Sequence, residues 1–268
     1  MSTAPASPSP FGPATEPLSL VVNGPVAEVR LNRPAKRNAI NDALVAALHL
    51  CFTTLPADVR VVVVSGEGDH FSAGLDLSEL SERSVAEGVI HSRSWHAAFE
   101  QIQFGRVPVI SALHGAVVGG GLELAASTHI RVADRSTFYG LPEGQRGLFV
   151  GGGGSARIPR LIGVARMADM MLTGRVMRAE EGQAVGLSTY LVEPGESRAQ
   201  ALALAEKVAA NAPLSNFAVV QALPRIAAQS QAEGLFTESL MAAIAQGDDA
   251  AKQRMQAFLD GKAGKVGQ

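Results

Sequence analysis

The stretch Pro108-Val-Ile-Ser-Ala-Leu-His-Gly-Ala-Val-Val-Gly-Gly-Gly-Leu-Glu-Leu-Ala-Ala-Ser127 decides the fold. It begins as a short apolar strand and ends as an apolar helix, with Gly119–Gly121 between them and Glu123 in the first helical turn. Glycines let a backbone approach a ligand without interference from a Cβ atom, and a helix start presents unpaired N–H groups. Taken alone, Glu123 is explained equally well as a catalytic acid or base and as a carboxylate that favours the helix dipole.

The composition indicates a globular chain and excludes several classes of function. The 268 residues are 47% hydrophobic and 18% charged, which is enough for a large core. The net charge is −2 without long runs of one sign, so we expect no nucleic-acid partner. No stretch approaches the length of a transmembrane helix, so no membrane insertion is expected. The single cysteine, Cys51, excludes an intrachain disulfide and is predicted to lie in the core.

The first residues differ in composition from the rest. Residues 1–17 are rich in Pro, Ser and Ala, and we expect them to form a disordered tail. They contain neither a basic leader nor an apolar run, so a signal peptide is not expected. The prediction is a cytoplasmic enzyme.

Strands and helices are predicted to alternate over residues 18–195. A hairpin at Asn23-Gly24 is the first feature. Later strands are predicted near residues 59–64, 108–113, 130–132 and 189–192. Helices are predicted around residues 42–55, 82–104, 155–172 and 179–185. Only helices are expected after residue 195, over 197–210, 214–229, 231–246 and 248–260. The sequence therefore predicts an α/β core, residues 18–195, followed by an α-helical region, residues 196–268.

Other motifs that carry chemistry fit poorly. Gly66-Glu-Gly68 follows a strand, but Phe71 stands where a dinucleotide fingerprint has its third glycine. Neither glycine cluster is followed by Lys-Ser or Lys-Thr, so no P-loop is predicted. The sequence has no Gly-x-Ser-x-Gly elbow, no His-Glu-x-x-His and no paired Cys-x-x-Cys. Neither a serine hydrolase nor a metal site is predicted.

Three motifs remain, and together they resemble the enoyl-CoA hydratase/isomerase (crotonase) superfamily. They are Phe71-Ser-Ala-Gly-Leu-Asp76, Gly119-Gly-Gly-Leu-Glu123, and Leu141-Pro-Glu143 before Gly151–Gly154. Weaker matches follow in the family order, namely Leu31-Asn-Arg-Pro34, Asn38-Ala39, Leu161-Ile-Gly163, Leu172-Thr-Gly174, Ala179-Glu-Glu181 and Gly186-Leu187. The resemblance covers residues 18 to 260. It implies a crotonase-like (ClpP/crotonase) spiral core of ββα units and C-terminal helices that build a homotrimer or a dimer of trimers.

The resemblance also implies an acyl-CoA thioester substrate and an oxyanion hole of two backbone N–H groups. On the matching positions these groups belong to Ala73 and Gly120. Donors fixed where charge develops need no reorganisation, and each typically lowers the barrier by about 2.7–4 kcal/mol. Asp76 matches the family's aspartate and is expected to tie down the turn that contains Ala73. No metal or redox cofactor is implied, because coenzyme A arrives as part of the substrate.

Glu123 and Glu143 match the two glutamates of family hydratases. Addition of water to a C=C bond needs a base for the water and an acid for Cα, and two carboxyl groups in a partly dry pocket can divide that work. We assign Glu123 to the water and Glu143 to Cα. Family isomerases typically keep only the group near Glu143. The resemblance therefore favours an enoyl-CoA hydratase, which adds water reversibly and syn to a 2-enoyl-CoA to give a 3-hydroxyacyl-CoA.

Other functions remain open. The same oxyanion hole serves double-bond isomerases, hydratase-lyases and C–C hydrolases. A non-catalytic binding member, for instance an RNA-binding or assembly subunit, is an alternative of another class. The balanced charge argues against RNA, and the presence of both glutamates argues against an inactive member.

The resemblance also assigns residues that contact coenzyme A or the substrate. These are Arg33, Arg37, Asn38, Ala39, Ser72, Gly74, Leu75, Asp76 and Gly119. Lys36 is more typical of a solvated loop charge, and Lys262 is a further candidate that would reach phosphates in a neighbouring subunit.

Several residues depart from the family pattern. His114 stands where the family usually has asparagine. Arg146 adds a charge near the site, which would suit a substrate carboxylate or polar acyl group, or a subunit interface. Trp95, Phe99 and Phe104 are candidates for the wall of an acyl pocket, although three aromatic residues at helical spacing are also typical of a plain core.

Overall fold

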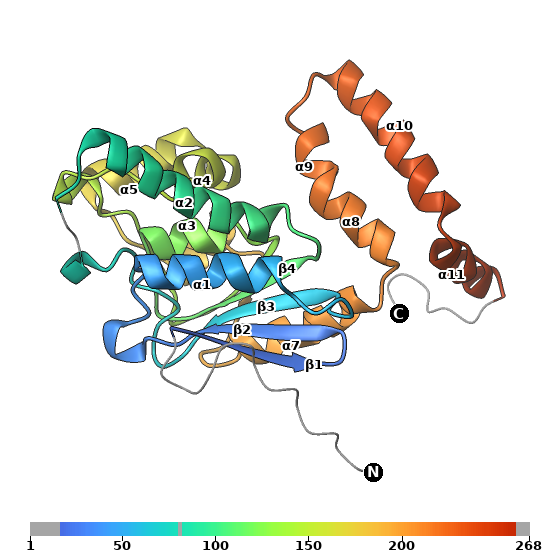
Figure 1. The fold of residues 1–268 in the computed structure, drawn as a ribbon, viewed down its shortest axis with the longest axis horizontal. Helices are drawn as coiled ribbons and strands as arrows, with labels where there is room; N and C mark the ends of the chain where they lie inside the picture. The colour runs from blue at the N-terminus through green and yellow to red at the C-terminus, as the bar shows by residue number, and fades with distance from the viewer. Residues whose placement is uncertain (1–16, 80–81, 261–268) are drawn as a thin grey trace, which may run out of the picture.

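The computed structural model describes residues 17–79 and 82–260, whose strands form two sheets (Figure 1). The six-stranded main sheet has the order β1-β2-β3-β4-β6-β9. Its strands are β1 (Leu18–Asn23), β2 (Val26–Leu31), β3 (Val61–Gly66), β4 (Val109–Leu113), β6 (Ile130–Asp134) and β9 (Tyr190–Val192). The hairpin predicted at Asn23-Gly24 joins β1 to β2 in antiparallel register, and the other neighbours pair in parallel.

Helices cover both faces of the main sheet (Figure 1). One face lies beneath α1 (Asp42–Thr53), α2 (Val85–Gln103) and α3 (Gly120–Ala126), and the other packs against α7 (Ser197–Ala209). Successive side chains of a strand point to opposite faces. Val62 and Val64 of β3 therefore join the larger core, which also contains Cys51, while Val61 and Val63 pack against α7. Burial on both faces explains the continuous apolar run of this strand.

The stretch that begins at Pro108 contains two strands that belong to different sheets. After β4 the chain turns at Gly115 (φ 54°) and enters β5 (Ala116–Val118). A Cβ atom on Gly115 would lie 2.2 Å from the carbonyl oxygen of Asp69, so only glycine fits this turn. The second sheet has the order β5-β7-β8, with β7 (Phe138–Gly140) and β8 (Met177–Arg178). Its short strands were not predicted.

Two predicted helices are each divided in the structure. The segment predicted as one helix over 155–172 is α4 (Gly154–Ile162) and α5 (Val164–Thr173), separated by Gly163 at φ 82°. The segment 214–229 is α8 (Pro213–Gln221) and α9 (Leu223–Ile226). The remaining predicted helices are confirmed as α6 (Ala179–Val185), α10 (Gln231–Gly247) and α11 (Asp249–Leu259). Short 3-10 turns occur at η1 (Pro34–Lys36), η2 (Leu77–Glu79) and η3 (Gly144–Arg146).

Helices α8–α11 form a C-terminal arm that stands apart from the two-sheet body (Figure 1). Helix α7 precedes the arm and packs on the main sheet, so the helical region predicted from residue 196 contains both α7 and the arm. No helix within residues 17–79 and 82–260 combines the length and apolarity that crossing a membrane would need. Of the predicted tail, residues 1–16 lie outside the described residues. Lys262 lies outside them as well.

Candidate active site

A cavity of about 370 Å³ brings together four segments that are distant in the sequence. They are the turn after β3, one face of α2, the junction of β5 with α3, and the loop from Pro142 to Gly152. The predicted site residues that line the cavity are Ala73, Leu75, Gly119, Gly120, Glu123 and Glu143. The structure therefore brings the four predicted catalytic residues to one cavity.

Glu123 lies in the first turn of α3 and exposes only 3% of its surface. Its Oε1 accepts hydrogen bonds from the N–H groups of Gly152 and Gly154, each at 2.8 Å. Glycine is needed there because a Cβ atom on Gly154 would lie 2.7 Å from Cγ of Glu123. Burial raises the pKa of Glu123 and the Glu143 charge adds to this, while the two N–H bonds oppose it. In residues 17–79 and 82–260, no donor is bonded to Oε2, which is the atom left for a ligand.

Glu143 stands at the start of η3 and is half-buried. Its Oε2 is buried and has no hydrogen-bond partner in the described part of the chain. Its Oε1 would lie 2.7 Å from a Cβ atom on Gly119, which has φ 52°. Burial raises the pKa of Glu143, and its own backbone N–H and the Arg146 charge oppose the rise. A carboxyl group with unmet hydrogen-bonding capacity beside a cavity is suited to proton transfer.

The oxyanion-hole prediction needs one correction. The N–H of Ala73 donates to the carbonyl oxygen of Arg37 at 2.9 Å, so it is not available to a ligand. By contrast, the N–H groups of Leu75 and Gly120 donate no hydrogen bond within residues 17–79 and 82–260. A Cβ atom on Gly120 would lie 3.6 Å from the Leu75 nitrogen, so both groups border the same space. Leu75 therefore replaces Ala73 as the candidate donor. Among the described residues, hydrogen bonds between this turn and residues 37–40 occupy the N–H of Ala73 and leave that of Leu75 free for a ligand. The sequence does not reveal these bonds.

Asp76 anchors the turn, as expected for a tying role. Its Oδ2 pairs with the guanidinium of Arg33 at 2.8 Å, and its Oδ1 accepts bonds from the hydroxyl and the N–H of Ser78. The bonds from Ser78 outweigh the effect of burial and, together with Arg33, lower the pKa of Asp76. Arg33 also donates to the carbonyl oxygen of Ala39. Arg33 is therefore part of the scaffold of the turn.

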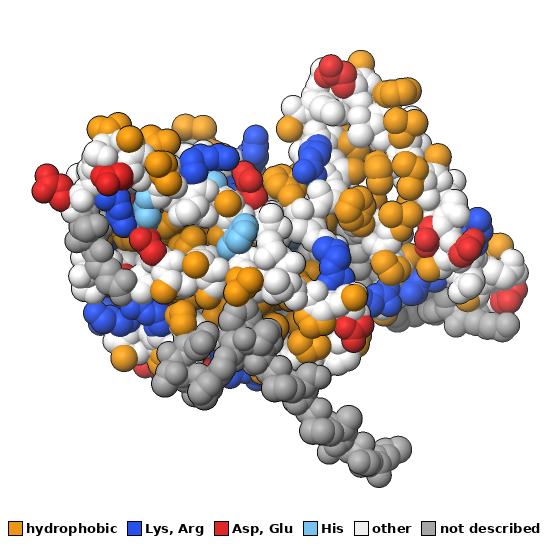
Figure 2. Space-filling model, viewed as in Figure 1, with side chains coloured by type: hydrophobic (Ala, Val, Ile, Leu, Met, Phe, Trp, Pro, Cys, Tyr) orange, Lys and Arg blue, Asp and Glu red, His pale blue; other side chains and the backbone are white. Residues whose placement is uncertain are grey.

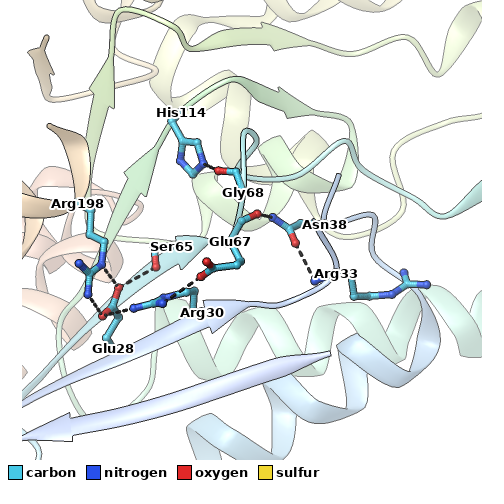
Figure 3. A network of polar contacts seen from close by, with 9 residues as sticks. All are labelled: Glu28, Arg30, Arg33, Asn38, Ser65, Glu67, Gly68, His114 and Arg198. Atoms are coloured by element: carbon cyan, nitrogen blue, oxygen red, sulfur yellow. Dashed lines mark hydrogen bonds and ion pairs between the residues drawn. The ribbon is translucent and has the colours of Figure 1, made fainter. Parts of the chain in front are cut away.

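Asn38 and Ser72, both predicted to contact coenzyme A, are fully buried and hold the loops together. The Asn38 amide donates to the carbonyl oxygen of Glu67 (2.9 Å) and accepts from the Arg33 N–H (Figure 3). It also donates to the carbonyl oxygen of His70 (2.7 Å). The Ser72 hydroxyl donates to the Asn38 carbonyl oxygen at 2.8 Å. A buried side chain whose groups are already bonded has nothing to offer a ligand, so both assignments are wrong.

Of the remaining residues predicted to contact coenzyme A, two have structural roles and one is exposed. Ala39 is buried, and Gly74 is needed by the backbone, since its φ is 90° and a Cβ atom would lie 2.6 Å from the Val118 carbonyl oxygen. Arg37 is exposed beside the turn and stays a prediction as a coenzyme A contact.

The residues that depart from the family pattern differ in whether they line the cavity. Trp95 and Arg146 line the cavity, whereas His114 lies outside it, with Nε2 2.9 Å from the Gly68 carbonyl oxygen (Figure 3). Phe99 packs edge-to-face behind Trp95 at 5.7 Å between ring centroids. Phe104 packs against Arg225, with 4.4 Å between its ring centroid and the guanidinium carbon, and it does not line the cavity. Its predicted role in the wall of an acyl pocket is therefore wrong.

Besides the N–H of Leu75, two hydrogen-bond donors of the site were not found from the sequence. They are the N–H donors of Gly152 and Gly154 that hold Glu123. The glycine run at 151–154 indicated close backbone approach, but its partner could not be read from the sequence.

Comparison with known proteins identifies the family. The family model described as enoyl-CoA hydratase/isomerase matches residues 22–265. A protein of Rhizobium meliloti named "Probable enoyl-CoA hydratase" is 32% identical over 91% of this chain and 95% of its own length. The alpha subunit of the fatty acid oxidation complex from Shewanella amazonensis is 45% identical over 130 residues, and the match spans only 18% of that longer protein.

Solved structures agree with these matches. The crystal structure of a candidate enoyl-CoA hydratase from Rhodopseudomonas palustris is 61% identical, with a TM-score of 0.90 over 92% of this chain and 95% of that one. The enoyl-CoA hydratase from Bacillus anthracis is 28% identical, with a TM-score of 0.87 over 93% and 98% of the two chains. The predicted crotonase-like α/β fold with a helical C-terminal region is confirmed. The chain belongs to the enoyl-CoA hydratase/isomerase family.

Proposed function

We propose that this protein is an enoyl-CoA hydratase, which adds water reversibly and syn to a 2-enoyl-CoA and gives a 3-hydroxyacyl-CoA. One observation carries the proposal: Glu123 and Glu143 line the same cavity as Leu75 and Gly120, whose N–H groups donate no hydrogen bond to the described residues. Relatives named as enoyl-CoA hydratases support it. Hydration needs two proton-transfer groups and one site for developing negative charge, and the cavity offers all three.

The contacts of the two glutamates support different roles for them. Glu123 accepts two N–H bonds, which favour its anion, so it takes a proton from water as the water oxygen attacks Cβ. The C=C electron pair moves through Cα to the thioester oxygen, where the N–H groups of Leu75 and Gly120 stabilise the enolate. Glu143, whose Oε2 accepts no bond from the described residues, starts neutral and gives its proton to Cα. Proton exchange with solvent then restores both groups.

We also propose that coenzyme A enters with the substrate and that no metal or redox cofactor takes part. The two N–H groups would supply the polarisation of the carbonyl, at about 2.7–4 kcal/mol for each donor. The glutamates would supply both proton transfers.

A direct assay tests the reaction. Purified protein is incubated with crotonyl-CoA and with a 3-enoyl-CoA, and loss or gain of the conjugated thioester absorbance is followed. We expect loss with crotonyl-CoA, and product analysis should show 3-hydroxybutyryl-CoA. Glu123→Gln and Glu143→Gln should each remove most of the hydration. If crotonyl-CoA does not react and Glu123→Gln keeps full isomerisation of the 3-enoyl-CoA, the enzyme is an isomerase and the hydratase proposal fails.

We further propose that the C-terminal arm joins copies of the chain into a homotrimer or a dimer of trimers. Large apolar side chains on the arm are exposed, and Figure 2 shows hydrophobic side chains gathered over these helices. They include Phe217, Leu235, Phe236, Leu240, Ile244, Phe258 and Leu259. Apolar patches of this kind mark interfaces. Light scattering should give three or six times the chain mass, and a monomer at micromolar concentration would contradict the proposal.

A further inference from the structure

Arg157 is a buried cation on α4, directly behind the glycine loop of the site. Arg157 exposes 8% of its surface. Its Nε donates to Oε1 of Gln103 at 2.6 Å, and its guanidinium donates to the carbonyl oxygen of Gly152 at 2.9 Å. No carboxylate of residues 17–79 and 82–260 forms an ion pair with it. A buried cation without an ion pair is costly, so its place calls for a reason.

The Gly152 peptide connects this cation to Glu123. Its carbonyl oxygen accepts from Arg157, and its N–H donates to Oε1 of Glu123 at 2.8 Å. The loop lies close around the guanidinium: Gly153 has φ 97°, and a Cβ atom there would lie 2.3 Å from a guanidinium nitrogen. Gln103, the last residue of α2, fixes the guanidinium from the other side. Gln103 and the Gly152 carbonyl oxygen therefore fix the position of the guanidinium.

We propose that Arg157 is a positioning residue of the active site, whose guanidinium fixes the Gly152 peptide so that its N–H holds Oε1 of Glu123 and leaves Oε2 to the cavity. The inference rests on the proposed role of Glu123 as the base of hydration. Arg157 does not line the cavity and acts only through the peptide and its charge.

The charges around Glu123 give the inference a measurable sign. Glu143 faces Glu123 from the η3 loop and raises its pKa, and Arg157 lowers it. On α2, Glu100 and His96 lie near Arg157; Glu100 opposes the fall that burial causes in the pKa of Arg157, and the Arg157 charge contributes to a lowered pKa of His96. Removal of the Arg157 charge should therefore raise the pKa of Glu123. The acid limb of the kcat profile, where Glu123 must be ionised, should move to higher pH.

Three variants test the inference. Arg157→Gln removes the charge, Arg157→Lys keeps it, and Arg160→Gln removes an exposed arginine one turn along the same helix. For hydration of crotonyl-CoA, Arg157→Gln should lower kcat by about tenfold to 100-fold, because small misplacement of a catalytic group has this effect. KM should stay nearly constant and the acid limb should shift upward. Arg157→Lys should move the limb back toward that of the parent, and Arg160→Gln should change neither.

A second readout does not need activity. The carboxyl carbons of 13C-labelled glutamate are titrated by NMR in the parent protein and in Arg157→Gln, with Glu123→Gln identifying the Glu123 signal. A higher Glu123 pKa in Arg157→Gln supports the inference, and an unchanged titration overturns it. If the parent hydrates no enoyl-CoA, the proposed function fails while this titration still decides on Arg157. If Arg157→Gln does not fold, Arg157→Lys serves in its place, because lysine keeps the charge but cannot bond both Gln103 and the Gly152 carbonyl oxygen. A lower kcat with KM and the Glu123 titration close to those of the parent supports the inference. A kcat equal to that of the parent, or a loss confined to KM, overturns it.

Discussion

Glu28 and Glu123 are two buried glutamates in opposite situations. They expose 5% and 3% of their surfaces. Burial raises the pKa of Glu28, but bonds from Arg198 (2.6 and 2.7 Å), Arg30 (3.1 Å) and Ser65 (3.0 Å) outweigh it and bring the pKa to about 2 (Figure 3). From the described part of the chain, Glu123 receives only two backbone N–H groups, and burial raises its pKa.

The difference separates a structural carboxylate from a candidate catalytic one. Glu28 ties β2 to β3 through Ser65 and to α7 through Arg198, and its saturated bonds keep it ionised. Glu123 keeps one oxygen for a ligand and a pKa that favours taking up a proton. Burial alone therefore does not mark a catalytic group; the number and charge of its partners do.

The largest expected contrast is in activity. Glu123→Gln should lower hydration of crotonyl-CoA by about 10²–10⁴-fold, the usual contribution of a general acid or base. Glu28→Gln should leave kcat of the folded protein close to that of the parent, because Glu28 lies outside the cavity. Steady-state assays on both variants check this. Equal losses would remove the distinction between the two carboxylates.

Glu28→Gln should lose more stability than Glu123→Gln, the reverse of their expected effects on activity. Glu28→Gln removes the Glu28 carboxylate from Arg198 and Arg30, although Arg30 keeps its ion pair with Glu67. Loss of hydrogen bonds between charged groups should reduce the free energy of unfolding by about 1.5–3 kcal/mol. Both arginines are partly exposed and can turn to water, which limits the loss. Glu123→Gln removes a buried charge and should leave the protein as stable or more stable. Urea unfolding of the parent and both variants measures the difference, and a destabilised Glu123→Gln would contradict it.

The pH dependence of unfolding should carry opposite signs for the two residues. The pKa of Glu28 falls on folding from its ordinary value of 4.5 to about 2, so its stabilisation is complete above pH 4.5 and is lost as the pH falls toward 2. The pKa of Glu123 rises on folding, so its contribution weakens stability as the pH rises above 4.5. Unfolding measured from pH 3 to pH 7 should show a weaker acid loss in Glu28→Gln. An acid loss as steep as that of the parent would contradict the Glu28 network.

The smallest effect concerns Arg146, the exposed cation beside Glu143. Its charge lowers the pKa of Glu143, so Arg146→Gln should raise that pKa and move the corresponding limb of the kcat profile to higher pH. Solvent screens exposed charges, so the shift should be less than about 1 pH unit. Profiles for parent and variant on crotonyl-CoA test this. A shift toward lower pH would show that Arg146 acts on another group.

The sequence predicted the features that follow from local pattern. The apolar run at 59–64, the hairpin at Asn23-Gly24 and the glycine run before Glu123 gave the main strands and the location of the site. The second sheet was missed because its strands are two or three residues long and its middle strand begins a glycine-rich and proline-containing loop. Helix 155–172 was predicted whole because its apolar spacing continues past the break at Gly163.

The errors within the site have one physical cause. Ala73, Asn38 and Ser72 lie in the right segments, but hydrogen bonds between segments distant in the sequence decide which groups remain free. Motifs bring groups into a neighbourhood and carry no information on which N–H is already bonded. The same applies to the donors of Gly152 and Gly154, whose partner is 29 and 31 residues away.

The donors proposed to stabilise the enolate belong to peptide groups, and this affects how the site can evolve. A codon change at position 75 alters the wall of the cavity and leaves the N–H in place. Among the twenty amino acids, only proline would delete it. At position 120 the Trp95 ring limits the choice further, since a Cβ atom would lie 2.8 Å from it. A lineage could thus retune its substrate at Leu75 and still inherit the same charge-stabilising groups.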